Sequence, residues 1–156
     1  MPTDLPDREL LDAAPDAMVV VDSRGEILLV NRQTEALFGY TRDELVGQFV
    51  EMLVPDQVRE QHPSRRQTYN NAPHQRAMGE GMELSGRHKS GREIPVEISL
   101  SPIFTDEGNY VVSAIRDVSF RREIAHQLME AKQTAEDATQ LKSRFLAAAS
   151  HDLRQP

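Results

Sequence analysis

Two neighbouring side chains near the C-terminus, His151 and Asp152, are of the right types to do chemistry together. A neutral imidazole is a good nucleophile near neutral pH, and one of its nitrogens can attack an electrophilic centre. The adjacent carboxylate can accept a hydrogen bond from the ring and orient it. Ser150 precedes them, but consecutive helical residues point about 100° apart and cannot form a hydrolase relay. These residue types therefore make His151 a candidate nucleophile, with Asp152 as a neighbour that can orient its ring.

Several kinds of site are excluded by what the sequence lacks. The 156 residues contain no cysteine, which rules out disulfides, thiolate metal sites and cysteine photoadducts. No His and acidic residues stand at metal-ligand spacing, so no metal is expected, and no glycine-rich nucleotide loop is visible. The net charge is −7 without a basic stripe, which argues against a nucleic-acid partner. With no apolar run near the ~20 residues of a membrane span and no secretory signal, we expect a cytoplasmic protein.

Short strand-like and helical runs alternate in the chain up to Ser119. Alternating or continuous apolar residues predict strands at 18–22, 27–30, 81–86, 94–100 and 110–115. A short helix precedes the first strand, and further short helices lie between the second and third. This order predicts an α+β fold with one five-stranded antiparallel sheet and helices on a single face. Beyond Ser119 no Gly or Pro occurs until Pro156, which predicts a long C-terminal α-helix.

The order of elements, and the residues along it, resemble the PAS sensory family. The resemblance is carried by residues 17–22, 25–27, 30–31, 36–40, 43–47, 89–97 and 115–119. It implies a PAS sensory domain over residues 9–119, preceded by an N-terminal tail at 1–8. In that family the sheet cups a small cavity beneath the helices. The resemblance implies that the cavity wall includes Met82, Leu84, Val96, Ile98, Val112 and Ala114, although each could instead simply fill the core.

His62 stands in a segment that resembles the part of haem-binding PAS domains carrying the proximal histidine. A neutral imidazole beside an apolar pocket is a suitable axial ligand for haem iron. Many PAS domains without haem have a similar segment, however, and Met82 stands where haem sensors tend to place an arginine. We therefore prefer a structural role for His62, with haem as the alternative cofactor.

The stretch from Ile115 to Ser119 resembles the join between the PAS sheet and its output helix, and this implies a signal-relay role for Asp117 and Ser119. Ser119 is also a reasonable helix N-cap. Beyond it, Ile124, Leu128 and three alanines recur at alternating spacings of four and three residues, which is a heptad seam. Residues 120–141 are therefore expected to form a coiled-coil signalling helix in a homodimer.

Residues 142–156 closely resemble the H-box of histidine kinases. Phe145 stands six residues before His151, Asp152 follows the histidine directly, and Pro156 lies five residues after it. The resemblance implies that this segment begins a dimerisation and phosphoacceptor domain, with His151 as phosphoacceptor. It also implies two partners, an ATP-binding kinase domain and a response-regulator receiver domain. Because no nucleotide loop is visible, this chain alone is expected to be a kinase fragment without activity.

The sequence thus predicts the sensory input module of a two-component histidine kinase. A small ligand or a partner would act on the PAS domain, and the helix would carry the change to His151. Two alternatives remain open: a haem-binding gas sensor that uses His62, and a PAS dimerisation module that binds no ligand.

Overall fold

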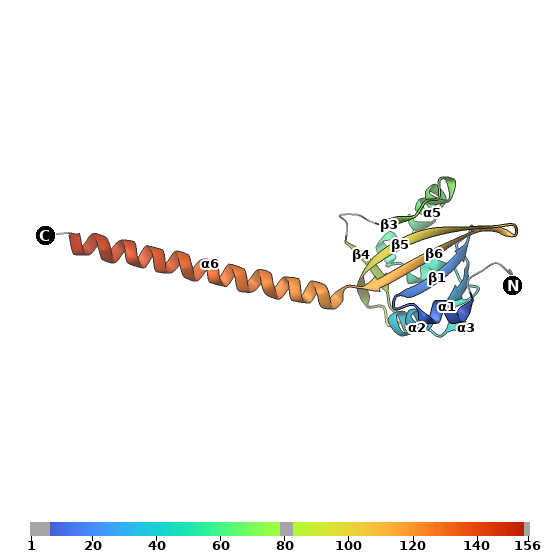
Figure 1. Ribbon diagram of the computed structural model, residues 1–156, viewed down its shortest axis with the longest axis horizontal. Coiled ribbons are helices and arrows are strands. Elements are labelled where there is room, and N and C mark those ends of the chain that lie inside the picture. Colours follow the sequence, from blue (N-terminus) through green and yellow to red (C-terminus); the bar gives the residue numbers. More distant parts are fainter. Residues whose placement is uncertain (1–6, 79–82, 155–156) are drawn as a thin grey trace. The chain divides into compact units, whose positions relative to one another are not determined.

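The computed structural model describes residues 7–78 and 83–154 and divides into two compact units. The first, Met1–Val118, contains the sheet and the short helices, and the second, Ser119–Pro156, contains one long helix. Figure 1 shows the elements of both. Each unit is described by itself below.

The first unit is built on a six-stranded antiparallel sheet whose strands run in the order β2-β1-β6-β5-β3, with β4 also paired to β5. The strands are β1 (Ala17–Asp22), β2 (Ile27–Val30), β3 (Arg76–Met78), β4 (Leu84–Arg87), β5 (Glu93–Thr105) and β6 (Gly108–Asp117). β1 and β6 pair although they lie at opposite ends of the domain sequence, and this pairing joins the N-terminal hairpin to the C-terminal strands in one sheet.

The predicted α+β fold with an antiparallel sheet is confirmed, but the sheet has six strands where the sequence predicted five. The additional strand is β3, which lies in a stretch that reads as a polar loop. β3 and β4 share one edge of β5: Met78 pairs with Ile98, and Leu84 pairs with Val96. A three-residue strand that exists because a longer neighbour offers it an edge leaves no periodic pattern in its own residues.

Six short helices precede β3, and their boundaries follow local chemistry. They are α1 (Arg8–Ala13), α2 (Arg32–Phe38), α3 (Arg42–Leu45), η1 (Val50–Leu53), α4 (Asp56–Arg59) and α5 (His62–Asn71). Asn31 caps α2 by accepting a hydrogen bond from the Thr34 amide, and Gly39 ends the helix in the left-handed conformation. Thr41 and Glu44 form a capping box around α3.

The prediction that all helices lie on one face of the sheet is wrong for α1. The main core contains Val19, Val21 and Ile115 on one face, together with Phe38 of α2. Leu11 of α1 instead packs with Val20 and Tyr110 in a second cluster. Successive strand residues alternate between faces, so α1 covers part of the face opposite to the main core.

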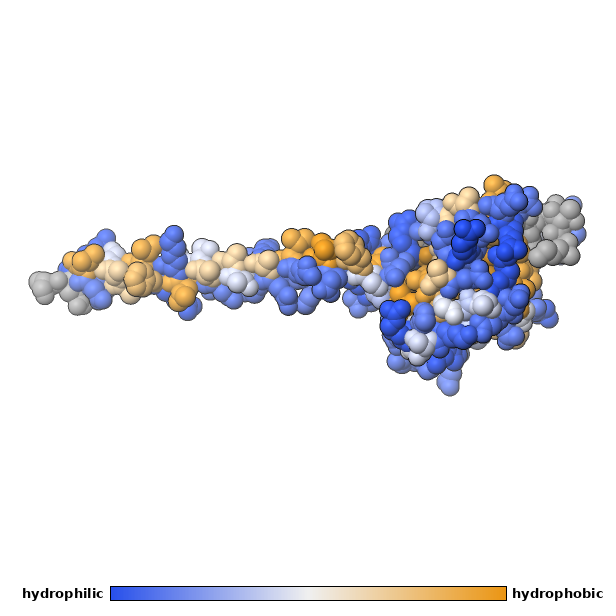
Figure 2. Space-filling view, turned by 90° about the horizontal axis from the view of Figure 1, so that it is seen from below, coloured by the Kyte–Doolittle hydropathy of each residue, from blue (hydrophilic) through white to orange (hydrophobic). Residues whose placement is uncertain are grey.

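The second unit is helix α6 (Ser119–Arg154), 36 residues long, and no described residue within it is buried. Its exposed apolar side chains include Leu128, Leu141 and Phe145. Figure 2 shows apolar surface along this helix, interspersed with hydrophilic residues. None of the helices in the described ranges is long and apolar enough to span a membrane.

Candidate functional site

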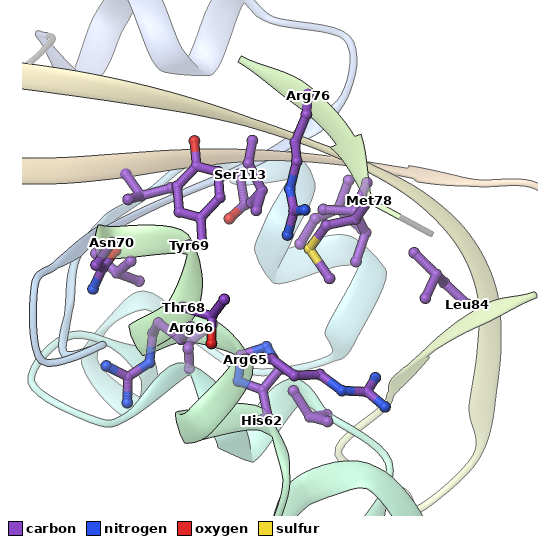
Figure 3. Close-up of a pocket in the computed structure, with 17 residues that line it drawn as sticks. His62, Arg65, Arg66, Thr68, Tyr69, Asn70, Arg76, Met78, Leu84 and Ser113 are labelled. Atoms are coloured by element: carbon purple, nitrogen blue, oxygen red, sulfur yellow. The ribbon is translucent and has the colours of Figure 1, made fainter. Parts of the chain in front are cut away.

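A cavity of about 370 Å³ lies on the main-core face of the sheet, where α5 stands over β3, β5 and β6. Figure 3 shows its lining, with His62, Tyr69 and Asn70 contributed by α5 and Arg76 by β3. The volume is that of roughly a dozen water-sized groups. The 17 lining residues are Val21, Val50, Val54, His62, Arg65, Arg66, Thr68, Tyr69, Asn70, Arg76, Met78, Leu84, Ile98, Leu100, Val111, Ser113 and Ile115.

The sheet floor of the cavity is ordered in rows across three strands. Arg76 of β3 is in register with Leu100 of β5, which is in register with Ser113 of β6. The neighbouring row, two residues along, consists of Met78, Ile98 and Ile115. All six residues line the cavity, so one row ends in an arginine and a serine while the next is entirely apolar.

The charged groups in the cavity lining are all of one sign. Arg65, Arg66 and Arg76 line it together with His62, and the lining contains no Asp or Glu among the residues that the structure describes. This contrasts with the whole chain, in which 25 acidic residues outnumber 18 basic ones. The wall of the cavity is thus apolar with a concentration of positive charge.

Glu51 is not part of the lining, but its carboxylate contacts two lining residues of α5. Its Oε1 lies 2.8 Å from Nδ1 of His62 and accepts a hydrogen bond from Nε of Arg66 at 3.1 Å. Burial by itself raises the pKa of the Glu51 carboxyl. The hydrogen bonds with His62 and with its own backbone amide, and the Arg66 guanidinium, outweigh burial and leave this pKa below its usual value. Glu51 is therefore a carboxylate at neutral pH that fixes two cavity residues.

Arg66 and Asn70 also tie α5 to the turn between β1 and β2. Nη1 of Arg66 and Nδ2 of Asn70 both donate to the carbonyl oxygen of Ser23, at 3.2 and 2.9 Å. The Arg66 guanidinium fills the space beside Gly25, where a Cβ atom would stand only 2.5 Å from it. Arg66 is thus committed to the protein's own structure.

Tyr69 is a buried residue at the centre of α5's contact with the cavity. Its hydroxyl donates to the carbonyl oxygen of His74 at 2.7 Å, and the Arg76 guanidinium lies 5.2 Å from the ring centroid. Burial raises the pKa of the Tyr69 hydroxyl, and the positive charge of Arg76 only partly offsets this. Tyr69 therefore acts as a neutral platform for Arg76.

The sequence-derived cavity residues divide into three groups. His62, Leu84 and Ile98 line the cavity. Val96 is buried in the main core but is absent from the lining, and Met82 lies outside the described residues. The remaining two, Val112 and Ala114, require a correction.

Val112 and Ala114 were assigned to the wrong face of β6. The β6 residues that line the cavity are Val111, Ser113 and Ile115, and strand residues alternate between faces. Val112 packs in the second cluster, against the face that α1 partly covers. Because β6 is a central strand with apolar residues on both faces, its alternation gave no signal for which set faces inward.

Arg76, Ser113 and Arg65 are cavity residues that sequence reasoning missed. Arg76 falls in the stretch that reads as a polar loop, and its side chain reaches the cavity only because β3 pairs with β5. Ser113 stands in an otherwise apolar strand, and a polar residue at a buried strand position is the one signal that could have drawn attention to it.

His151 is exposed near the end of α6, with 71% of its side chain accessible to solvent. Its Nδ1 lies 3.7 Å from Oδ1 of Asp152, which is beyond hydrogen-bonding distance. At the other end, Asp117 is the last residue of β6 and Ser119 the first of α6. Across the described residues, no group of three or more His, Cys, Asp and Glu side chains could hold a metal ion.

Comparison with known proteins finds a family match for the first unit and relatives that cover most of the chain. Residues 7–118 match the PAS fold family. Sensor protein FixL of Bradyrhizobium diazoefficiens is 28% identical over 151 residues, which cover 96% of this chain and 30% of FixL. The cell-division control histidine kinase PdhS of Brucella ovis is 30% identical over 149 residues, covering 96% of this chain and 14% of PdhS. The chain thus spans less than a third of the length of either relative.

Solved structures agree on the fold. The PAS domain of a protein from Colwellia psychrerythraea superimposes with a TM-score of 0.61 at 26% identity, covering 71% of this chain and 92% of that one. The PAS domain of BvgS from Bordetella pertussis gives a TM-score of 0.60 at 21% identity, covering 81% of this chain and 94% of that one. Together with the sheet order and the family match over most of the length, these similarities show that the chain belongs to the PAS family.

Proposed function

We propose that this chain is the sensory input module of a two-component histidine kinase and that His151 is its phosphoacceptor. The observation that carries the proposal is the extent of the similarity to FixL and PdhS. It covers 96% of the chain, whereas the PAS family match ends at residue 118, so the similarity to two sensor kinases must extend into α6.

The chemistry of α6 is consistent with this role. An exposed imidazole is accessible to an ATP-binding domain, which would be a partner of this chain. A ring nitrogen of His151 attacks the γ-phosphorus of ATP, the bond to the bridging oxygen breaks, and ADP leaves with the electron pair. The ring proton passes to solvent or to Asp152. Phosphate then moves to an aspartate of a receiver domain.

The exposed seam of α6 supports a dimer. Leu128 and Phe145 are 66% and 70% exposed, and a helix this long that leaves apolar residues in water gains by pairing with a second copy. The domain layout in the proposal is a PAS domain at 9–119, a signalling helix at 120–141 and the start of the phosphoacceptor segment at 142–156.

Transfer of labelled phosphate tests the proposal. The chain is joined to the ATP-binding domain of a related histidine kinase and incubated with γ-labelled ATP. We expect acid-labile label on the wild type and on His126→Gln, which changes another exposed histidine of α6, and none on His151→Gln. Label that persists on His151→Gln would show that His151 is not the phosphoacceptor.

A haem-binding sensor is the second candidate, and one contact favours it. His62 lines the cavity while its Nδ1 is engaged by Glu51, which leaves Nε2 free to coordinate. Metal-ligating histidines usually have such a carboxylate behind them. A haem held there would supply a gas-binding iron, and because it is several times larger than the dozen or so groups that the 370 Å³ cavity holds, the cavity would have to widen to admit it. The test is the absorbance spectrum after addition of haem: the candidate requires a Soret band that His62→Ala abolishes and His74→Ala preserves.

A further inference from the structure

We propose that the cavity binds an aliphatic carboxylate, with its head group at Arg76 and Ser113 and its chain against the apolar row beside them. The inference rests on the proposed sensory function, because it names the ligand class of the same domain. It is drawn from the cavity's shape, its charge and the hydrogen-bonding state of its polar side chains.

The three arginines of the lining differ in their partners, and Arg65 is exposed and donates a hydrogen bond to Gln61. Arg66 is ion-paired with Glu51 and bonded to Ser23, so it is already committed. Within residues 7–78 and 83–154, Arg76 forms no ion pair, and its described contact is with the face of Tyr69. Arg76 is exposed, and neither it nor the described part of the lining has an acidic partner, so its guanidinium can pair with an anion.

The hydroxyl groups in the cavity lining differ in whether they already form a hydrogen bond. The hydroxyls of Tyr69 and Thr68 are taken up by the carbonyl oxygens of His74 and Ser64. Ser113 is 8% exposed and lines the cavity, and its hydroxyl makes no hydrogen bond in the described part of the chain. It shares a row with Arg76, one strand removed, and Figure 3 shows the Arg76 side chain extending from β3 into the cavity.

The third step is the nature of the anion. A planar carboxylate accepts two parallel hydrogen bonds from a guanidinium and can take another from a hydroxyl. The remaining wall is apolar: Ile98 and Ile115 belong to the neighbouring row, and Leu84 comes from β4. A small hydrophilic acid would leave this wall in contact with water. An aliphatic tail removes this wall from water, and the gain in binding increases with each CH₂ group that is buried.

Size selects the length of the tail. The cavity's 370 Å³ corresponds to roughly a dozen water-sized groups at ~30 Å³ each. Decanoate has about that many non-hydrogen atoms and is the probe for the test. Decanol has the same tail and lacks the charge.

Binding of both probes is measured by isothermal titration calorimetry on the full chain. We expect saturable binding of decanoate and at least tenfold weaker binding of decanol, because a hydrogen bond to a charged group changes affinity by roughly ten- to a hundredfold. Arg76→Met keeps the apolar part of the side chain. It should weaken the binding of decanoate by the same factor and leave the affinity for decanol unchanged. Arg92→Met, which removes an exposed arginine outside the cavity lining, should alter neither.

Three results would overturn the inference: no saturable binding of decanoate, equal affinity for the two probes, or an Arg76→Met variant that binds decanoate as the wild type does. Circular dichroism of Arg76→Met shows whether it is folded, and Ser113→Ala gives an independent test at the other end of the row, with an expected loss for decanoate only. Binding is measured without phosphoryl transfer. If decanoate does not bind, the proposal that His151 is the phosphoacceptor is therefore not affected. If His151 is not labelled, the proposed ligand class is likewise not affected.

Discussion

The side chain of Asn31 is fully buried and forms hydrogen bonds to three parts of the chain. Its Oδ1 accepts from the Met18 amide and from the amide and hydroxyl of Thr34, at 2.8, 3.1 and 2.9 Å. Its Nδ2 donates to the carbonyl oxygens of Leu11 and Asp16, at 2.8 and 2.9 Å. One amide thus joins α1, β1 and α2.

Asn31→Ala should destabilise the domain by about 2–4 kcal/mol, because it removes the helix cap and leaves buried backbone groups without partners. Urea unfolding followed by circular dichroism measures this. Asn71→Ala, at an exposed position, is the control and should change stability by less than about 0.5 kcal/mol. Equal midpoints for both variants would mean that this network does not stabilise the fold.

Glu51 should make the domain's stability depend on pH in a defined direction. Its folded-state pKa lies below the ordinary 4.5, so its contribution is fully present above that value and is lost as pH falls through the folded pKa. Glu51→Gln should therefore cost about 1–3 kcal/mol at pH 7 and progressively less towards pH 3.

Urea unfolding at a series of pH values tests this expectation. Glu60→Gln, which removes an exposed carboxylate nearby, should follow the wild-type profile throughout. A constant difference between wild type and Glu51→Gln from pH 7 to pH 3 would contradict the assignment, because it would show that ionisation of Glu51 does not contribute.

At the scale of elements, β4 approaches α2 closely because Gly86 has no side chain. A Cβ atom at Gly86 would stand 2.7 Å from Cε1 of Phe38, which is 1% exposed. Phe38 cannot move without disturbing the main core around it.

Gly86→Ala should therefore destabilise the domain by roughly 1–3 kcal/mol through overpacking. Ser85→Ala, one residue earlier on β4, is the matched control and should be within about 0.5 kcal/mol of wild type. Denaturant midpoints give the comparison. A stabilised Gly86→Ala would show that the core has room at this point.

The seam of α6 gives an element-scale prediction about association. A charge at Leu128 would have to be buried between two helices, so Leu128→Glu should shift the chain towards the monomer. Gln140→Glu lies on the opposite face of the heptad and should leave association unchanged. Sedimentation velocity at several concentrations measures it, and a monomeric wild type at all concentrations would refute the dimer.

On the scale of the whole molecule, the sequence predicted what local signals determine. The apolar runs at 18–22 and 27–30 and the absence of helix breakers after Ser119 predicted elements that the structure contains. Each depends on residues close together in the chain.

The features that were missed depend on pairing between distant segments. β3 forms only beside β5, and through it Arg76 reaches the cavity. The inward face of β6 was misassigned because Val111 and Val112 are equally apolar, and only the pairing of β6 between β1 and β5 decides which of them faces the main core. The candidate ligand site was therefore only partly predictable, since it is assembled by register.

We propose that α6 carries the state of the PAS domain to His151 as a continuous helix. Inserting two alanines after Ala138 rotates the helix beyond it by about 200°. Inserting seven adds nearly two full turns, so the orientation of the helix beyond Ala138 changes by only about 20°. With the chain joined to an ATP-binding domain, the rate of labelling of His151 is compared across wild type and both variants. We expect His151 to be labelled at the wild-type rate in the seven-residue insertion variant and at a different rate in the two-residue insertion variant. Identical rates in all three would contradict it.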